Sequence, residues 1–180
     1  MVRTRVGYAG GTTENPTYAN IGDHSETIQI EYDPSQVSYE QLLDVFWSSH
    51  NPTRRSWSRQ YASIIFYHDE EQRRLAEETK ERQAARAQGE ILTEIVPAGE
   101  FTPAEAYHQK YRLRQSPAFM GEFSAIYPHD DDFAASTSAA RVNGYLGGHG
   151  TCEGLRGEVD SLGLSAEGGE RLLEIVCKGG

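Results

Sequence analysis

Apolar and polar residues alternate in several short segments of the chain, and this period of two is typical of β-strands. The alternation is cleanest over residues 26–32, where isoleucines and a tyrosine share one face. Residues 61–67 are instead apolar on both faces apart from Ser63, which is typical of an interior strand covered on two sides. Strands are therefore expected over residues 2–8, 26–32, 61–67 and 92–97.

Helical spacing of apolar residues follows the second of these strands. Residues 38–41, Ser-Tyr-Glu-Gln, fit a capping box, and residues 42–47 place their apolar side chains on one broad stripe. His50-Asn51-Pro52 is expected to end this helix. A charged surface helix is predicted over residues 69–86, and another helix over residues 103–114, with its proline in the first turn.

The order of strands and helices predicts an α+β fold, a two-layer sandwich of a mixed sheet and helices over residues 1–115. The composition then changes. Residues 134–140 are rich in Ala, Ser and Thr, residues 144–150 are rich in glycine, and residues 162–177 fit one short helix. Residues 116–180 are therefore expected to be a C-terminal glycine-rich coil with a short helix that wraps the domain.

Composition narrows the class of partner and the cellular compartment. The net charge of the 180 residues is −10 and the pI is about 5.0, which argues against nucleic acid and anionic membrane surfaces as partners. No segment approaches the roughly 18 apolar residues that a membrane span needs, and no apolar region follows the charged start, as a signal peptide would require. Two cysteines, Cys152 and Cys177, do not form a disulfide framework in a chain of this length. A reducing, cytoplasmic location is expected.

Glu26 is the first candidate for chemistry. By strand parity it faces the same way as Ile28 and Ile30, toward the core. A carboxyl group in an apolar site has its pKa raised, which suits a proton donor near neutral pH. The alternative is that Glu26 begins the strand, where that face is still wet.

Two tyrosines are candidates for acting with this carboxyl group. Tyr18 lies in a loop that could bring its hydroxyl near Glu26, and Tyr61 is expected to open a buried strand. A tyrosine hydroxyl at a strand end can polarise a developing oxyanion. Most of the ten tyrosines are expected to pack in the core, among them Tyr8, Tyr32 and Tyr67.

The histidines and cysteines indicate a functional site less clearly than Glu26 and the two tyrosines do. His24 beside Asp23, and His129 before three aspartates, superficially resemble metal ligands, but no second pair at ligand spacing accompanies them. Acidic, solvated loops are the better explanation. Cys152 follows the glycine-rich segment, where a mobile thiol can reach another sulfur for exchange. The alternative for Cys152 is a free surface cysteine without function, and Cys177 has less to recommend it.

Several motifs follow one another in a fixed order. They are Gly7-Tyr8-Ala9-Gly10-Gly11, Asn15-Pro16-Thr17-Tyr18, His24-Ser25-Glu26, Tyr32-Asp33-Pro34, Ser38-Tyr39-Glu40-Gln41-Leu42-Leu43, Phe46-Trp47, His50-Asn51-Pro52 and Arg59-Gln60-Tyr61. In this order they resemble the peptide methionine sulfoxide reductase A family over residues 2–115. The resemblance implies that family's α+β fold and its activity, the thiol-dependent reduction of methionine S-sulfoxide, free or in proteins.

In that family a cysteine within a Gly-Cys-Phe-Trp-Gly segment attacks the sulfoxide sulfur. A buried glutamate and two tyrosines help to protonate the oxygen, and a resolving cysteine then forms a disulfide that thioredoxin reduces. The resemblance implies the glutamate role for Glu26, the tyrosine roles for Tyr18 and Tyr61, and the resolving role for Cys152. It implies no prosthetic group or metal; thioredoxin or another dithiol would be the reductant.

The chain departs from the family pattern at several places, among them a loop between Tyr18 and Glu26 that is shorter than in many members. The Gly-Cys-Phe-Trp-Gly segment, which precedes the Gly7 position in the family, is absent from this sequence. The family's first strand and first helix are expected to be missing with it. The aspartate usual before the Tyr61 position is absent too, because residues 54–58 hold no acid; Trp57, within them, could replace a lost aromatic wall of the substrate site.

Three hypotheses follow from these departures. The first is an N-terminally truncated relative of the reductases, inactive alone because proton donors without a sulfur nucleophile cannot deliver two electrons. The second is a non-catalytic pseudoenzyme that binds methionine-sulfoxide-like or peptide ligands. The third is a fragment that does not fold stably, since the loss of a strand and a helix exposes a sheet edge and core.

Overall fold

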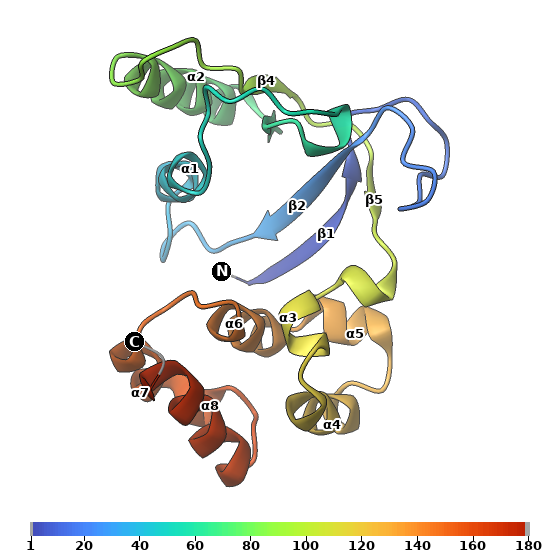
Figure 1. The fold of residues 1–180 in the computed structure, drawn as a ribbon, viewed down its shortest axis with the longest axis vertical. Coiled ribbons are helices and arrows are strands. Elements are labelled where there is room, and N and C mark those ends of the chain that lie inside the picture. The colour runs from blue at the N-terminus through green and yellow to red at the C-terminus, as the bar shows by residue number, and fades with distance from the viewer. Residues whose placement is uncertain (1, 179–180) are drawn as a thin grey trace. The chain divides into compact units, whose positions relative to one another are not determined.

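The computed structural model describes residues 2–178 (Figure 1). Contacts divide the chain into two compact units. We call residues 6–104 the sheet unit, and residues 105–178 together with residues 2–5 the helical unit. Each unit has a hydrophobic core of its own.

The strands of the described chain form two separate sheets. They are β1 Arg3–Ala9, β2 Ser25–Glu31, β3 Ile64–Tyr67, β4 Glu94–Pro97 and β5 Phe101–Pro103. The first sheet has the order β2-β1-β5, with β5 antiparallel to β1, and the second is the parallel pair β3-β4. The four predicted strands are present, β3 and β4 as shortened segments. Parallel and antiparallel pairing both occur, as a mixed sheet requires, but in two sheets rather than one.

The sheet unit contains α1 Tyr39–Ser48, the 3-10 turn η1 Arg59–Tyr61 and α2 Glu70–Ala84. The predicted capping box of α1 is confirmed, because the Ser38 hydroxyl accepts from the Gln41 N–H at 3.1 Å and Gln41 Oε1 accepts from the Ser38 N–H at 2.8 Å. The buried core joins α1 to α2 and β3. Its members are Leu43, Trp47, Ile65, Ala76 and Ile91.

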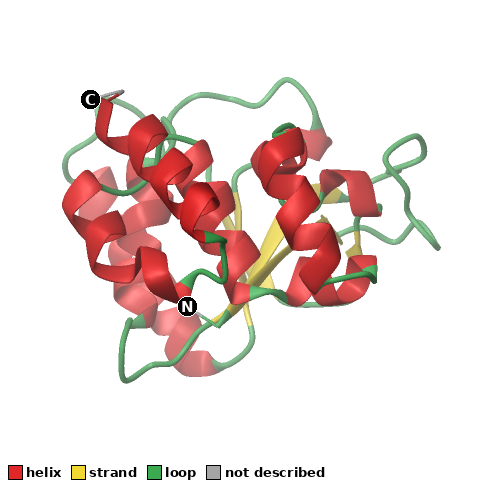
Figure 2. Ribbon diagram, turned by 90° about the horizontal axis from the view of Figure 1, so that it is seen from below, coloured by secondary structure: helices red, strands yellow, loops and turns green. Residues whose placement is uncertain are grey.

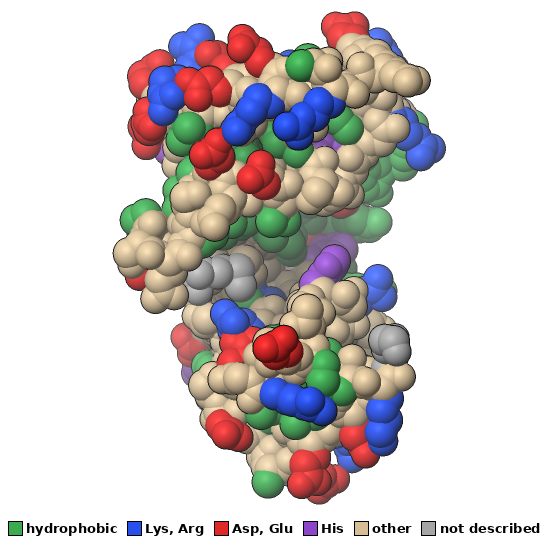
Figure 3. Space-filling view, turned by 90° about the vertical axis from the view of Figure 1, so that its left-hand side faces the viewer, with side chains coloured by type: hydrophobic (Ala, Val, Ile, Leu, Met, Phe, Trp, Pro, Cys, Tyr) green, Lys and Arg blue, Asp and Glu red, His purple; other side chains and the backbone are tan. Residues whose placement is uncertain are grey.

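The predicted charged character of α2 is also present. Arg74 pairs with Glu71 and Glu78 along the helix at 2.6 and 2.5 Å. Acidic and basic side chains are interspersed on this face of the sheet unit (Figure 3). Exposed pairs of this kind add little stability, so packing of the opposite face holds α2 in place.

The helical unit consists of short helices joined by loops (Figure 2). They are η2 Ala106–His108, α3 Tyr111–Arg114, α4 Pro117–Ile126, α5 Asp130–Ala135, α6 Thr137–Leu146, α7 Cys152–Glu158, η3 Val159–Ser161 and α8 Ala166–Lys178. Buried side chains from most of these elements meet in one core: Leu113, Phe119, Phe123, Phe133, Ala139, Val142, Leu155, Leu162 and Leu172.

The expectation of coil over most of residues 116–180 is wrong in its secondary structure. Four helices, α4 to α7, occupy that region, and only α8 coincides with the predicted short helix. Ser136 and Thr151 cap α6 and α7 with hydrogen bonds to backbone N–H groups. Packing into a shared core stabilises these short helices, and the sequence gives no local sign of that packing. The contact division lies between Ala104 and Glu105; the predicted domain boundary after residue 115 stays a prediction.

The predicted helix over residues 103–114 is wrong as well. Its first residue ends β5, and the remainder forms two short turns, η2 and α3. Lys110 separates these turns with φ at 53°, in the left-handed region that an L-residue rarely adopts. Its ammonium donates to the carbonyl oxygens of Thr4 at 2.6 Å and Ala134 at 2.8 Å. Tertiary hydrogen bonds therefore outweigh local helix preference at this position.

A disulfide joins Cys152 to Cys177 within the helical unit. It links the first residue of α7 to the last turn of α8, across a separation of 25 residues in the sequence. Cys152 is thus not the free surface cysteine considered as one alternative.

Candidate functional site

Asp23 organises the loop that precedes β2. Its carboxylate accepts hydrogen bonds from the Thr12 N–H at 2.8 and 2.9 Å and from the Thr13 N–H at 3.0 Å, and from both threonine hydroxyls. These bonds, first of all that from the Thr12 backbone, hold the pKa of Asp23 well below its ordinary value. These bonds join the two ends of the loop that carries Tyr18, residues 12–13 and residue 23.

His24 completes the closure. Its Nδ1 accepts from the Gly11 N–H at 3.2 Å, so its Nε2–H donates to the Thr13 carbonyl oxygen at 2.9 Å. His24 is 5% exposed. Asp23 and His24 thus serve the loop structure rather than a ligand. Across residues 2–178, no group of three or more His, Cys, Asp or Glu side chains is placed to hold a metal ion.

A second set of bonds fixes η1 beside the start of β2. The buried Ser25 hydroxyl donates to the Arg59 carbonyl oxygen at 2.6 Å. The Arg59 guanidinium pairs in turn with Glu94 of β4 at 2.6 Å. Side chains at the start of β2 and on η1 are therefore held next to one another.

The side chains brought together form a cluster of one carboxyl group and three aromatic rings. Gln60 Nε2 donates to Glu26 Oε1 at 2.7 Å, and the hydroxyls of Tyr61 and Tyr18 share a hydrogen bond. The Trp57 and Tyr61 rings lie 4.9 Å apart between centroids, tilted by 45°. We call Tyr18, Glu26, Trp57, Gln60 and Tyr61 the acid–tyrosine cluster. Partial burial, followed by the charge of Glu26 and by Tyr18, raises the pKa of Tyr61.

The structure corrects two expectations about these residues. Glu26 is exposed rather than core-facing, and Ile28 on the same face is 56% exposed. The reason is that this face of β2 borders a cavity instead of a packed layer, so the wet-face alternative describes it. Tyr61 does not open a buried strand: it lies in η1, 42% exposed, and in β3 itself only Ile65 is buried. Of the tyrosines predicted to be core, Tyr8 is confirmed as buried.

The exposure of the cluster suits it to contact a ligand. Tyr18 and Tyr61 are 48% and 42% exposed, and Trp57 is 82% exposed. Two phenolic hydroxyls beside a carboxyl group can donate to, and pass protons toward, a polar oxygen bound among them. The Trp57 ring offers an apolar face next to these polar groups.

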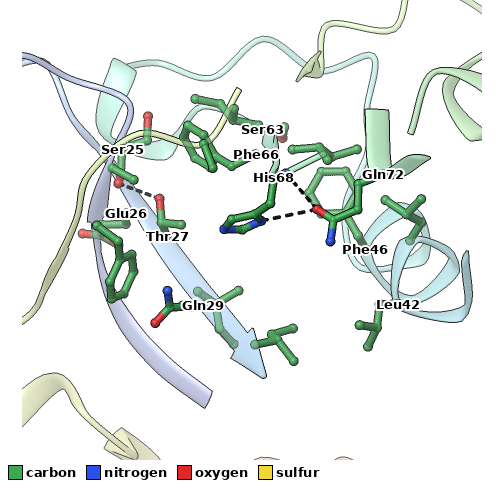
Figure 4. Close-up of a pocket in the computed structure, with 18 of the residues that line it drawn as sticks. Ser25, Glu26, Thr27, Gln29, Leu42, Phe46, Ser63, Phe66, His68 and Gln72 are labelled. Atoms are coloured by element: carbon green, nitrogen blue, oxygen red, sulfur yellow. Dashed lines mark hydrogen bonds between the residues drawn. The ribbon is translucent and has the colours of Figure 1, made fainter. Parts of the chain in front are cut away.

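The cavity beside Glu26 is the second feature of the site. It has a volume of about 590 Å³ and is lined by side chains of β2, α1, β3 and the start of α2. Figure 4 shows Leu42 and Phe46 on one side of the opening and Glu26, Thr27 and Gln29 of β2 on the other. Tyr18 and Tyr61 are not among its lining residues. The cluster therefore lies at the border of the cavity, with Glu26 common to both.

Sequence reasoning did not single out Gln60, which the structure adds to the candidate site. It stood within a recognised motif, yet no pattern pointed to its contact with Glu26, which spans 34 positions. Cys152 was predicted as a resolving thiol; it lies in the helical unit, bonded to Cys177. That role stays a prediction.

The fold and the cluster define an α+β protein with a carboxyl–tyrosine site. Comparison with protein families matches residues 1–142 to peptide methionine sulfoxide reductase and residues 129–177 to the helical domain of selenoprotein methionine sulfoxide reductase A. The chain belongs to the peptide methionine sulfoxide reductase family. The resemblance stated from the sequence is thereby confirmed.

Individual relatives agree with this assignment. A peptide methionine sulfoxide reductase of Drosophila melanogaster is 44% identical over 167 residues, which are 92% of this chain and 67% of that protein. Peptide methionine sulfoxide reductase A5 of Arabidopsis thaliana is 42% identical over 152 residues, which are 81% of this chain and 59% of that protein. The chain thus spans between 59% and 67% of the length of these relatives.

The solved structures confirm the α+β class. The crystal structure of Mxr1 from Saccharomyces cerevisiae in reduced form superposes with a TM-score of 0.58 and 29% identity, covering 63% of this chain and 71% of that chain. As regards membranes, none of the helices within residues 2–178 is both long and apolar enough to span one.

Proposed function

We propose that this chain carries the substrate-binding and proton-donating groups for the thiol-dependent reduction of methionine S-sulfoxide, free or in oxidised proteins. The observation that carries the proposal is the acid–tyrosine cluster, in which Gln60 binds the Glu26 carboxyl group and the neighbouring Tyr61 is hydrogen-bonded to Tyr18 and feels the charge of Glu26. Membership of the reductase family supports the same chemistry.

The reaction balances with two thiols. A sulfoxide and two thiols yield a thioether, a disulfide and water, so two electrons and two protons reach the sulfoxide. In this proposal the Tyr18 and Tyr61 hydroxyls donate to the sulfoxide oxygen and Glu26 passes the proton that lets it leave. Gln60 orients the carboxyl group of Glu26 through its 2.7 Å bond. Trp57 packs against the apolar methyl end of the substrate.

The electrons must come from sulfur. The two cysteines of the chain, Cys152 and Cys177, are bonded to one another in the structure. In the proposed cycle a dithiol such as thioredoxin first reduces this bond. The sulfoxide oxidises a separate nucleophilic cysteine, which this sequence does not hold, to a sulfenic acid, and the Cys152 thiol then attacks that sulfur to give a disulfide and water. Such reductants work in a cytoplasmic environment, which we propose as the location.

The second candidate is a non-catalytic relative that binds methionine-sulfoxide-like or peptide ligands. The exposure of Trp57 at 82% favours it, because the aromatic face is available for binding without any thiol chemistry. Binding is common to both candidates, and the chain as sequenced is expected to show no turnover under either. The nucleotide sequence upstream of this chain separates them: an in-frame Gly-Cys-Phe-Trp-Gly segment would favour the reductase, and a stop codon close upstream would favour the non-catalytic relative.

Binding is tested with the S and R epimers of N-acetyl-methionine sulfoxide methylamide, titrated against the protein and followed by NMR shifts. We expect saturable binding of the S epimer, at least tenfold tighter than that of the R epimer. Glu26→Gln and Tyr61→Phe should each weaken it by roughly three- to thirtyfold, as the loss of one hydrogen bond predicts. Tyr111→Phe, an exposed tyrosine of the helical unit, is the matched control and should bind as the unaltered protein does.

Two results would speak against this proposal. Equal binding of both epimers would remove the stereochemical basis of the site, and shifts confined to residues outside the cluster would place binding elsewhere. With dithiothreitol as reductant, we expect no turnover by the chain as sequenced. Turnover that disappears in Cys152→Ser would instead make Cys152 the nucleophile.

A further inference from the structure

Residues 23–26, at the start of β2, are hydrogen-bonded to both of the segments that bring tyrosines to the acid–tyrosine cluster. The first two of them bind the backbone of residues 11–13, where the loop that carries Tyr18 begins. The last two bind η1, one through a hydroxyl group and one through a carboxyl group. Parts of the site that are distant in the sequence are therefore joined to one short stretch of chain.

Ser25 makes the buried contact of this stretch with η1. The residue is 1% exposed, and its hydroxyl donates to the Arg59 carbonyl oxygen at 2.6 Å. The next residue of η1, Gln60, donates to Glu26, and Tyr61 follows directly. A carbonyl oxygen that loses a buried donor is left unpaired at a cost in free energy. Removal of the Ser25 hydroxyl should therefore displace the backbone of η1 and the two side chains that it presents.

A second contact of η1 does not replace that bond. The Arg59 guanidinium pairs with Glu94 at 2.6 Å, but the two side chains are 37% and 45% exposed. Ion pairs in contact with water add little stability, because the solvent screens them and two long side chains must be held still. The buried hydroxyl of Ser25 is thus the stronger constraint on where η1 lies.

Asp23 makes the corresponding contact with the loop of Tyr18. Its carboxylate accepts from the backbone N–H groups of residues 12 and 13. Farther along the loop the Asn20 N–H donates to the Thr17 carbonyl oxygen at 3.0 Å, and Tyr18 lies between these two residues. The loop is thus closed where it begins and again around Tyr18. Loss of the first closure should leave the position of Tyr18 less well defined.

We propose that Asp23 and Ser25 are positioning residues of the acid–tyrosine site. Asp23 places the loop of Tyr18, and Ser25 places η1 against Glu26. Both act through other residues, by setting the distances between the groups that would meet the sulfoxide oxygen. The inference rests on the proposed function for the identity of the ligand, whereas the placement itself is measured without any ligand. Because the two residues hold different segments, their effects are separable.

The first experiment follows the Gln60 side-chain amide and the Tyr61 phenol by NMR, with no ligand present. Ser25→Ala should move the Gln60 amide signals toward those of Glu26→Ala, in which their acceptor is absent. Partial burial and the charge of Glu26 raise the pKa of Tyr61, so displacement of η1 should lower that pKa. Loss of stability alone would move neither signal in the folded protein.

Two further variants control this experiment. Ser25→Thr keeps the hydroxyl group and should restore both the Gln60 signals and the titration of Tyr61. Ser161→Ala removes a hydroxyl that also donates to a backbone carbonyl oxygen, that of Glu158 at 2.7 Å, but in the helical unit. It should leave both signals as they are in the unaltered protein. Circular dichroism and thermal unfolding establish that each variant is folded before the spectra are compared.

Asp23→Asn tests the other segment. It removes the charge and one acceptor oxygen, so amide hydrogen exchange in residues 12–20 should become about tenfold faster. The Gln60 side-chain signals should stay in place, because η1 keeps its own bond. Asp33→Asn is the matched control: this carboxylate accepts from the N–H and the hydroxyl of Ser35, outside the site. It should leave exchange in residues 12–20 unchanged.

The second experiment adds the S and R epimers of N-acetyl-methionine sulfoxide methylamide. Ser25→Ala and Asp23→Asn should each reduce the preference for the S epimer by about threefold or more, since the donors no longer meet at one oxygen. Both control variants should keep the preference of the unaltered protein. A general loosening of the protein would instead weaken the binding of both epimers to the same extent.

The two experiments separate failure of the positioning roles from failure of the proposed function. Unchanged Gln60 and Tyr61 signals in Ser25→Ala, or unchanged loop exchange in Asp23→Asn, would overturn the positioning roles whether or not a sulfoxide binds. Signals in Ser25→Thr that match those of Ser25→Ala would do the same, because the hydroxyl would then not be what places η1. If neither epimer binds but the ligand-free signals move as expected, the proposed function fails and the positioning roles stand.

Discussion

Lys110 shows at the scale of one residue how the fold changes a titration. The residue is 6% exposed, and its ammonium donates to the Thr4 and Ala134 carbonyl oxygens. Burial, with a contribution from the charge of Arg5, lowers its pKa from 10.5 to about 8. The folded protein therefore releases this proton at a lower pH than the unfolded chain does.

The consequence is a pH dependence with a defined sign. Between about pH 8 and 10.5 the unfolded chain binds one more proton than the folded protein at this residue, so the free energy of unfolding rises with pH there. In urea unfolding, the free energy of unfolding of the unaltered protein should rise by roughly 1–3 kcal/mol relative to that of Lys110→Met between pH 8 and pH 10. Lys178→Met, at an exposed position, is the control. Parallel profiles for the Lys110 variant would contradict the expectation.

Single residues of the site were predictable to different degrees. The order of motifs gave Glu26, Tyr18 and Tyr61 as candidates, and the structure places Tyr61 where Tyr18 and the charge of Glu26 both act on it; their roles stay predictions. The strand-parity argument placed Glu26 in the core because it assumed that a packed layer covers the face with the isoleucines. In the structure a cavity borders that face instead. Gln60 could not be predicted, since side-chain contacts between distant positions depend on how β2 and η1 are placed.

The ends of helices were predictable where residues close in the sequence form the cap. The capping box gave the start of α1 correctly because its hydrogen bonds involve residues within one turn. The break at Lys110 depends instead on carbonyl oxygens of Thr4 and Ala134, distant in the sequence. No local pattern reports such bonds, and this is why residues 103–114 resembled one continuous helix.

The cap of α1 supports a prediction at the scale of the element. Ser38→Ala removes the acceptor for the Gln41 N–H and should lower the free energy of unfolding by about 1 kcal/mol. Ser48→Ala is the matched control at the other end of the helix, where the hydroxyl only donates to the Val45 carbonyl oxygen. It should change stability by less than about 0.5 kcal/mol. Equal losses in thermal unfolding of both variants would show that the cap is not specific.

At the scale of the whole molecule, the disulfide is the main covalent constraint within the helical unit. It closes a loop from Cys152 to Cys177, and a cross-link of this span restricts the unfolded chain. Reduction should lower the free energy of unfolding of the helical unit by roughly 2–4 kcal/mol. Hydrogen exchange of the amides in α6 and α8 measures this loss of stability in the helical unit separately from the sheet unit.

A double variant provides the control for that measurement. Cys152→Ser combined with Cys177→Ser should show the lower stability already without reductant, and added reductant should then change nothing. Unchanged exchange in α6 and α8 after complete reduction would contradict the expectation.

The same disulfide has a consequence for how any reductase assay on this chain is interpreted. A dithiol added to drive sulfoxide reduction also cleaves the Cys152–Cys177 bond. Reductant concentration then sets two quantities at once, the supply of electrons and the fraction of molecules with an intact helical unit. Ligand binding should therefore be measured with and without dithiol, and the two-serine variant, which has no bond to cleave, should give the same result in both conditions.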